Sequence, residues 1–503
     1  MNGKAERFLL AFLCSVLCFL TFFFITTKIT IITYPYGIEN GEGFVLYTTT
    51  LFQKGEFPYG SIAESPYWVN NYPPVYNLVC AVLSGIGFPQ LAVGRAVSGA
   101  ALFGIGIMLA LCLYRMALPA VLSGMCGMFF IVQPFLFWSA FYRVDYLAVF
   151  FSACGAAWFL YALQKDRQWW VSILFFVLGI YTKHSALIAP CAAMATLICL
   201  RNKRWQAYVV CLVAASLLPG VILQYCTGGG FLRHLFYYTA TQFSHFGISI
   251  IARNCGLLLV FTLVGGMGCV QMIRKKQFDR FSLFTALYFI LNGGGLFIMF
   301  KEGSSSLYMI EYAFSAVLAG GFFMHRFKLL FPLRYANGIK LAVLIGLAVS
   351  LLWVWCIGNP SRIKVVAGFN DLLASMRIRD DEIYRKVSSS LGRVLCEDVS
   401  FPVLCGKSPE WNPFMLKQLH ERGILPDSVI RLDIREKKFD MIVMEFELKP
   451  INGEVSVPGL QLLRFSSGLL NDIFSSYRIV PLESYVPVQP IPRIERVTIL
   501  YPR

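Results

Sequence analysis

Charged side chains are scarce in this sequence. Only 14% of its 503 residues are Asp, Glu, Lys or Arg, whereas soluble globular chains carry about 25%. Hydrophobic residues make up 57% of the chain, and the mean hydropathy is +0.62. The shortage of charge excludes a soluble globular protein and predicts a polytopic α-helical membrane protein.

Signals for metal and nucleotide chemistry are also missing. The 15 cysteines and 5 histidines form no C-x-x-C pair and no cluster with the spacing of zinc ligands. Neither a G-x-x-x-x-G-K-[ST] loop nor a dinucleotide fingerprint is present. The sequence therefore predicts no nucleotide cofactor and no nucleic-acid partner, and it leaves the presence of a divalent cation, magnesium or manganese, open. It also leaves open whether Cys396 and Cys405 form a disulfide or remain two free thiols.

Long apolar runs dominate the first 357 residues. We expect eleven membrane-spanning helices, near 8–32, 94–114, 118–137, 146–163, 168–181, 185–200, 206–224, 255–273, 281–299, 307–324 and 338–357. With the N-terminus in the cytoplasm, sixteen Lys and Arg fall on the cytoplasmic side and eight at the outer ends. The positive-inside rule therefore predicts that the chain begins inside and ends outside.

Residues 168–200 are too long a stretch to read simply as one helix. A single helix would place the basic run RNKR (residues 201–204) outside and invert every later span. Two short helices that meet at TKHSA avoid this, with Lys183 and His184 at the bend. Each helix spans only about 22 Å, less than the ~30 Å hydrocarbon core, so we expect the bend to lie below the outer membrane surface.

Polar sequence begins near residue 358. The last part of the chain holds eighteen of its 28 acidic residues and twenty Lys and Arg. KFDMIVMEFEL predicts a strand, and FNDLLASMRIRDDEIYRKVSSSL and NPFMLKQLHERGI predict helices. We therefore expect two domains: a transmembrane domain over 1–357, whose first outer loop (33–93) carries membrane-lying helices, and a soluble α/β domain over 358–503 on the outer face.

The few acids of the transmembrane part are gathered at one face. Seven of ten lie in predicted outer loops or at outer helix ends, namely Glu39, Glu42, Glu56, Glu64, Asp145, Glu302 and Glu311. Arg143, Lys183 and Lys301 join them there. Carboxylates can remove a proton from a hydroxyl, and cations can hold a phosphate as its charge grows. The mixture suggests transfer from a lipid phosphate or pyrophosphate to a hydroxyl.

Several motifs carry a resemblance to a known family. They are ENGEGFVLYTTTLFQKGEFPY, NNYPPVYNLV, GFPQLAVGRAVSG, YRVDYLAVFF, GIYTKHSALIAP, YMIEYAF and NPFMLKQLHERGILPDSVIRLDIREKKFDMIVM. Together and in this order they resemble bacterial GT-C glycosyltransferases, the relatives of protein O-mannosyltransferases and of the lipid A aminoarabinose transferase. Two positions depart from that pattern: Glu39 stands where an Asp is usual, and Leu307–Tyr308 replaces Asn-Tyr.

The resemblance implies roles for individual residues. Glu39 or Glu42 would be the catalytic base, and spacing alone does not order the two. Both would share a face if the loop turns helically there. Lys183, Arg143 and Arg95 would contact the donor phosphate. Supporting or substrate-binding positions would be Asp145, His184, Tyr308, Glu311, Tyr72 and Tyr76.

Each role has a purely structural alternative. Lys183 could snorkel at a helix end, Arg95 could be an interface anchor, and His184 could cap the bend. Arg143 and Asp145 could form a plain ion pair, and Tyr72 and Tyr76 could stiffen a membrane-lying segment with Pro73 and Pro74.

The sequence thus leads to the hypothesis of a multi-pass bacterial inner-membrane enzyme with a periplasmic C-terminal domain. It would move a sugar, with inversion, from a polyprenyl-phosphate donor to a hydroxyl of a glycan, lipid or protein acceptor. A transporter or flippase would need mid-membrane charges and usually an internal repeat, and we find no repeat. A non-catalytic scaffold for envelope assembly is the other alternative.

Overall fold

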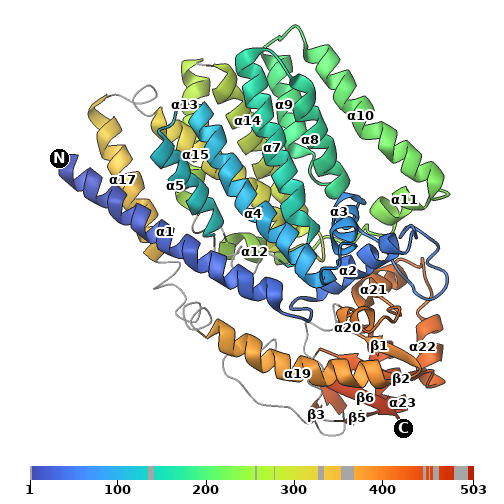
Figure 1. The fold of residues 1–503 in the computed structure, drawn as a ribbon. Helices are drawn as coiled ribbons and strands as arrows, with labels where there is room; N and C mark the ends of the chain where they lie inside the picture. Colours follow the sequence, from blue (N-terminus) through green and yellow to red (C-terminus); the bar gives the residue numbers. More distant parts are fainter. Residues whose placement is uncertain are drawn as a thin grey trace.

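A computed structural model gives the fold of the chain. It describes residues 3–133, 141–254, 256, 258–276, 278–326, 333–352, 368–445, 449–451, 454–456, 464–480 and 497–503. Most of these residues are helical, and a small sheet lies near the C-terminus (Figure 1). The helical membrane architecture predicted from composition is confirmed.

A helix occupies each of the eleven predicted spans. These helices are α1 (Gly3–Thr33), α4 (Gln90–Arg115), α5 (Ala120–Ile131), α7 (Val144–Lys165), α8 (Trp169–Thr182), α9 (Ile188–Cys199), α10 (Trp205–Cys226), α13 (Leu259–Lys275), α14 (Arg280–Gly295), α15 (Met309–His325) and α17 (Leu333–Leu352). Within the described residues, six stretches are long and apolar enough to cross a membrane. The predicted ends of the third and eleventh spans, 134–137 and 353–357, lie outside the described residues.

The chain breaks where the sequence predicts a bend. Helix α8 ends at Thr182 and α9 begins at Ile188. With 14 and 12 residues, these helices are about 21 and 18 Å long. Lys183 has an extended backbone at the break (φ −149°, ψ 120°), which ends α8.

Short elements connect the long helices. They are α2 (Asn40–Gln53), α3 (Val75–Ser84), α11 (Gly230–Leu232), the π-helical turn η1 (Arg233–Tyr237), α12 (Phe246–Asn254), and the 3₁₀ turns η2 (Leu296–Phe300) and η3 (Ser306–Tyr308). Helices α2 and α3 lie at the end of the bundle that also carries the C-terminal sheet (Figure 1).

The C-terminal part surrounds a small mixed sheet. Its elements are α19 (Phe369–Ser389), β1 (Arg393–Cys396), α20 (Ser400–Leu404), α21 (Pro413–Glu421), α22 (Ser428–Arg435), β2 (Phe439–Met444), β3 (Lys449–Ile451), β4 (Glu454–Ser456), α23 (Ser467–Ser476), β5 (Tyr477–Val480) and β6 (Thr498–Pro502). The main sheet has the order β1-β2-β6-β5; β1 and β2 are parallel, and the other pairs are antiparallel. The predicted strand KFDMIVMEFEL is confirmed over Phe439–Met444 as β2, and its last residues, 446–448, lie outside the described residues. The two predicted helices are confirmed as α19 and α21.

Both faces of this sheet are covered. Successive side chains of a strand point to opposite faces. Met441 and Val443 accordingly pack with α19, while Ile442 and Met444 pack with α21, α22 and α23. Both clusters also take in residues of the first loop, among them Tyr34 on one side and Tyr67 on the other. The C-terminal part is therefore packed onto the first loop rather than tethered at a distance.

The two cysteines of this part are free thiols. Cys396 is buried at the end of β1, and Cys405 is half-buried just after α20. Of the two possibilities that the sequence left open, the structure has the unbridged pair.

Candidate functional site

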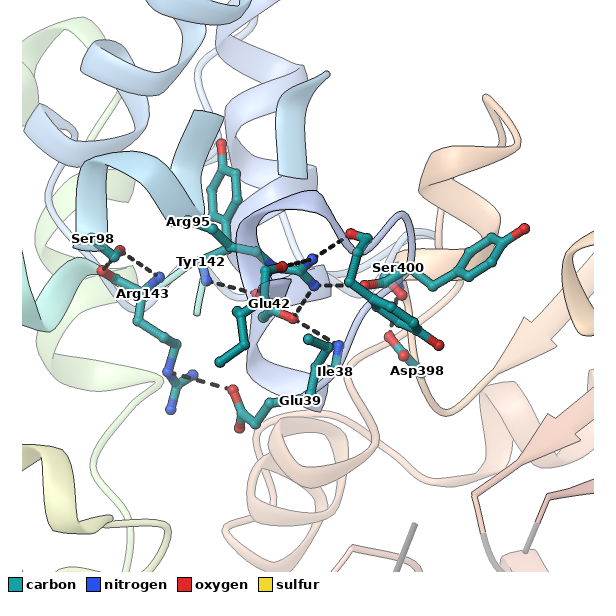
Figure 2. A network of polar contacts seen from close by, with 12 residues as sticks. Ile38, Glu39, Glu42, Arg95, Ser98, Tyr142, Arg143, Asp398 and Ser400 are labelled. Carbon is teal, nitrogen blue, oxygen red and sulfur yellow. Dashed lines mark hydrogen bonds and ion pairs between the residues drawn. The ribbon is translucent and has the colours of Figure 1, made fainter. Parts of the chain in front are cut away.

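The two glutamates of the first loop begin α2 and then diverge. Glu39 is the residue before the helix and has an extended backbone (φ −138°, ψ 134°), whereas Glu42 lies in the first turn. The carboxylate of Glu39 points toward Arg143, and that of Glu42 points toward Arg95 (Figure 2). Because Glu39 precedes the helical turn, the two carboxylates do not share a face as a helical loop would require.

Glu42 is completely enclosed in a hydrogen-bond network. Its side chain and that of Arg95 are both 0% exposed. The Oε1 atom accepts hydrogen bonds from Arg95 Nε (2.7 Å) and the backbone N–H of Tyr142 (2.8 Å). The Oε2 atom accepts from Arg95 Nη2 (2.7 Å) and the backbone N–H of Ile38 (2.8 Å). Four donors on two oxygens leave little room for a further proton donor.

These contacts set the protonation of Glu42. Burial alone would raise the pKa of its carboxyl, but the Arg95 guanidinium and the two backbone N–H groups hold the pKa below the ordinary value. A carboxylate that is ionised, saturated and closed to solvent is suited to holding structure together. It is poorly suited to receiving a proton from a substrate.

Arg95 is equally occupied. Beyond its two bonds to Glu42, Nη1 donates to the carbonyls of Ile31 (3.0 Å) and Tyr34 (2.5 Å), and Nη2 donates to that of Tyr36 (2.5 Å). A guanidinium has five N–H donors, and all five are used. This differs from the prediction that Arg95 contacts a donor phosphate, because Glu42 and the carbonyls of Ile31, Tyr34 and Tyr36 already satisfy every donor.

Glu39 is in the opposite situation. Its side chain is 38% exposed, and its Oε2 lies 3.6 Å from Arg143 Nε. Neither of these two atoms has a hydrogen-bond partner within the described part of the chain. Arg143 is fixed through its backbone instead: Ser98 Oγ donates to its carbonyl (3.0 Å) and accepts from its N–H (3.4 Å). The loose pair of Glu39 and Arg143 therefore keeps capacity for a ligand on both side chains.

Lys183 lies at the break between α8 and α9 and faces α7. Its ammonium donates to Asp145 Oδ1 at 2.6 Å and lies 3.6 Å from the centre of the Tyr308 ring. Both Lys183 and Asp145 are buried. Asp145 is in the first turn of α7, two residues after Arg143. Since an ammonium has three N–H donors, this lysine can bond Asp145 and still offer a donor to an anion.

Tyr72 connects these charges to the first loop. Burial raises the pKa of its phenol to about 12, and the charges of Arg143, Asp145 and Lys183 act on it as well. The first loop, α7, the α8–α9 break and η3 thus bring five of the predicted residues to one place: Tyr72, Arg143, Asp145, Lys183 and Tyr308.

Three other predicted residues, His184, Glu311 and Tyr76, contact other side chains or the backbone rather than the charges of this group. His184 is half-buried beside Phe236 (ring centres 5.5 Å apart), and its Nδ1 has no hydrogen-bond partner among the described residues. Glu311 is buried and accepts from the hydroxyl of Tyr288 at 3.0 Å. Tyr76 is fully buried, and its hydroxyl bonds the Gly94 carbonyl (2.8 Å) and Ser98 Oγ (2.9 Å). Tyr76 therefore anchors α3 to α4.

Over the ranges that the structure describes, no three His, Cys, Asp or Glu side chains gather in a way that could hold an ion.

Some residues at the site gave no signal in the sequence. Asp398 and Ser400, from the C-terminal part, lie against the loop around Glu39 (Figure 2). The backbone N–H of Tyr142 and the hydroxyl of Ser98 hold Glu42 and Arg143. A backbone N–H is present in nearly every residue, so its role cannot be predicted from the sequence. Contacts between residues some 360 positions apart likewise leave no local sequence pattern.

Comparisons with known proteins give no match by sequence. No family model matches the chain, and no curated protein matches it.

Solved structures do share the fold. ArnT from Cupriavidus metallidurans, in the apo state, matches with a TM-score of 0.58 at 13% identity over 95% of this chain and 96% of that one. The same protein bound to undecaprenyl phosphate matches with a TM-score of 0.56 at 15% identity, over 99% and 98%. An oligosaccharyltransferase from Archaeoglobus fulgidus, tethered with an acceptor peptide, matches with a TM-score of 0.50 at 11% identity, over 86% of this chain and 69% of that one. The chain is a multi-pass membrane protein with the fold of the GT-C glycosyltransferases.

Proposed function

We propose that this protein is an inverting membrane glycosyltransferase. It transfers a sugar from a polyprenyl-phosphate donor to a hydroxyl of a glycan, lipid or protein acceptor. The observation that carries the proposal is the placement of Glu39. Its side chain is 38% exposed, and its Oε2 atom is buried beside Arg143 without a hydrogen-bond partner among the described residues. This carboxylate belongs to a fold shared with an enzyme crystallised with undecaprenyl phosphate.

Glu39 is the base in this proposal. Its carboxylate takes the proton from the acceptor hydroxyl as the oxygen attacks the anomeric carbon. Glu42 is excluded from this role because its two oxygens already accept four hydrogen bonds. The geometry thus favours one of the two glutamates between which the sequence did not decide.

Lys183 and Arg143 hold the leaving phosphate. As the new bond to the acceptor oxygen forms, the bond between the anomeric carbon and the phosphate oxygen breaks. The electron pair of that bond remains on the polyprenyl phosphate. Two cations placed beforehand stabilise the growing charge without reorganising. Asp145 and Tyr308 fix the ammonium of Lys183.

The membrane arrangement is part of the same proposal. Residues 1–357 form the transmembrane catalytic domain and 358–503 an extracytoplasmic domain, with the N-terminus in the cytoplasm and the site at the periplasmic face of a bacterial inner membrane. A lipid-linked donor suits this side, where cytosolic nucleotide sugars are absent. The short helices α8 and α9 bring Lys183 below the membrane surface, to the depth of a lipid head group.

The test is complementation of a gene deletion with matched variants. Glu39→Gln removes the base and keeps the side-chain shape. Glu56→Gln makes the same change at an exposed glutamate of the same loop. Envelope glycans are compared by mass spectrometry at equal expression. We expect wild type and Glu56→Gln to restore one defined sugar. Glu39→Gln should restore about 10²- to 10⁴-fold less of it, the usual contribution of general base catalysis.

Two results would overturn the proposal. Full restoration of the envelope sugar by Glu39→Gln would show that Glu39 is not the catalytic base. A deletion strain whose glycans and lipids are unchanged in composition, but in which a lipid-linked sugar accumulates on the cytoplasmic side, would favour a flippase.

A further inference from the structure

The short helix α20 of the C-terminal part packs against α2, the helix that Glu39 begins. At Gly43, in the first part of α2, an added Cβ would lie 2.5 Å from the backbone nitrogen of Ser400 and 2.7 Å from Cγ2 of Val399. Contacts this short are not tolerated, and a backbone atom cannot rotate away as a side chain can. Gly43 therefore permits an approach of the two helices that any other residue would prevent.

The same segment also touches the loop on the other side of Glu39. A Cβ at Gly37 would lie 2.5 Å from Ser400 Oγ and 2.9 Å from Asp398 Oδ2. Asp398 is buried, and its carboxylate accepts from the Ser400 N–H at 2.8 Å, which fixes the start of α20. Figure 2 shows Asp398 and Ser400 beside the turn that carries Glu39 and Glu42.

Further contacts secure the preceding residues of the loop to the C-terminal part. The hydroxyl of Tyr34 donates to Asp380 (2.7 Å), and that of Tyr36 donates to Asp381 (2.5 Å). The ring of Tyr36 also stacks on that of Phe401 in α20, with centres 6.0 Å apart. The stretch from Tyr34 to Gly43 is thus held from the C-terminal side by these contacts and from the transmembrane side by Arg95.

We propose that residues 398–404 are a positioning element for the catalytic base, so that the C-terminal part completes the active site instead of only covering it. This inference rests on the proposed role of Glu39. The physical reason is that Glu39 has no strong partner of its own. Its carboxylate is positioned by the backbone turn that Arg95 and α20 clamp between them. In enzymes, a displacement of about 1 Å at a reacting group can cost 10²-fold in rate.

The test compares two alanine substitutions at glycines of the same loop. Gly43→Ala pushes α20 away from α2, although alanine by itself favours a helix over glycine. Gly60→Ala is the matched control, because a Cβ there meets no atom within 4 Å and the backbone is not left-handed. Both full-length variants are purified in detergent and are also expressed in the deletion strain.

Three readouts separate positioning from general damage. Amide hydrogen exchange should accelerate over 34–43 and 398–404 in Gly43→Ala while the transmembrane helices keep wild-type rates. Binding of undecaprenyl phosphate to the purified chain should stay within twofold of wild type, because Lys183 and Arg143 are untouched. The fraction of envelope glycan modified should fall at least tenfold. Gly60→Ala should match wild type in all three.

Unchanged hydrogen exchange over 34–43 in Gly43→Ala would refute the idea that residues 398–404 hold this part of the loop. Faster exchange together with full modification of the envelope glycan would refute a role of this contact in catalysis. If Gly43→Ala does not fold, Tyr36→Phe replaces it. That change removes only the bond to Asp381 and should raise exchange over 34–43 with a smaller loss of modification. The exchange measurement needs no substrate, so it tests the clamp even if the proposed transferase activity fails.

Discussion

The buried pair of Arg95 and Glu42 allows a quantitative prediction. In Arg95→Met, the apolar side chain fills much of the space, but Glu42 is left as a buried carboxylate with two backbone donors. The carbonyls of Ile31, Tyr34 and Tyr36, at the end of α1 and the start of the first loop, lose their partner as well. Removing one partner of a buried ion pair costs about 3–5 kcal/mol. We expect a loss near 4 kcal/mol, a large fraction of a typical unfolding free energy of about 5–15 kcal/mol.

The contribution of Glu42 to the unfolding free energy should change with pH in opposite directions in wild type and in Arg95→Met. In wild type the pKa of Glu42 is lowered, so its contribution is full above the ordinary pKa of a glutamate and is lost as the pH falls. Without Arg95, burial dominates and raises the pKa of Glu42 in the folded state. The variant should therefore be most stable at low pH and lose stability as the pH rises, so that its difference from wild type is larger at pH 8 than at pH 5.

A double-mutant cycle measures the pair itself. In Glu42→Gln with Arg95→Met, both charges are gone, and the amide oxygen can still accept from a backbone N–H. We expect the double variant to cost at least 2 kcal/mol less than the sum of the single variants, within the usual range for residues in direct contact. Unfolding is followed by tryptophan fluorescence during titration with sodium dodecyl sulfate in mixed micelles. A cost below about 1 kcal/mol for Arg95→Met, or additive single effects, would refute the network described here.

Two further predictions concern the phosphate group and the C-terminal interface. Lys183→Met should weaken binding of undecaprenyl phosphate at least tenfold, while Lys54→Met, at an exposed lysine of the first loop, should not change it; equal affinities would remove Lys183 from the phosphate site. Burial raises the pKa of Asp398 to about 7, so this group favours the folded state most below its unfolded pKa of about 4. Its contribution declines as the pH rises to 7, by up to about 4 kcal/mol for a shift of some three units. Asp398→Asn should flatten the decline of unfolding free energy between pH 4 and 7 without abolishing it, because the buried Asp380 and Glu397 titrate in the same direction. An unchanged slope would contradict this assignment.

Much of the architecture was predictable because membrane insertion is a local property of the sequence. Each long apolar run became a helix, and the charge count required the break at Lys183 that separates α8 from α9. The nearly continuous apolar run of β2 and the periodic pattern of α19 were equally plain, since both reflect burial along a single element. The grouping of acids and cations at one face also identified residues that the fold brings together, including Asp145 and Lys183.

What the sequence could not decide is which charges neutralise each other. Glu39 and Glu42 stand three residues apart in the same loop, and as two residues of one type they cannot be told apart from the sequence. Their roles separate only because Arg95, more than fifty residues later, reaches Glu42 and not Glu39. The same pairing helps to occupy every donor of Arg95, which the sequence had assigned to the donor phosphate.

The sequence by itself determined the membrane helices, their break and the gathering of acids and cations at one face, because hydrophobic burial and charge exclusion act residue by residue along the chain. Only the tertiary structure decided which glutamate keeps a partly exposed side chain, and that residues 398–404 press against the loop that carries it. Those outcomes depend on pairings between segments up to some 360 residues apart, whose geometry is set by the packing of the whole fold.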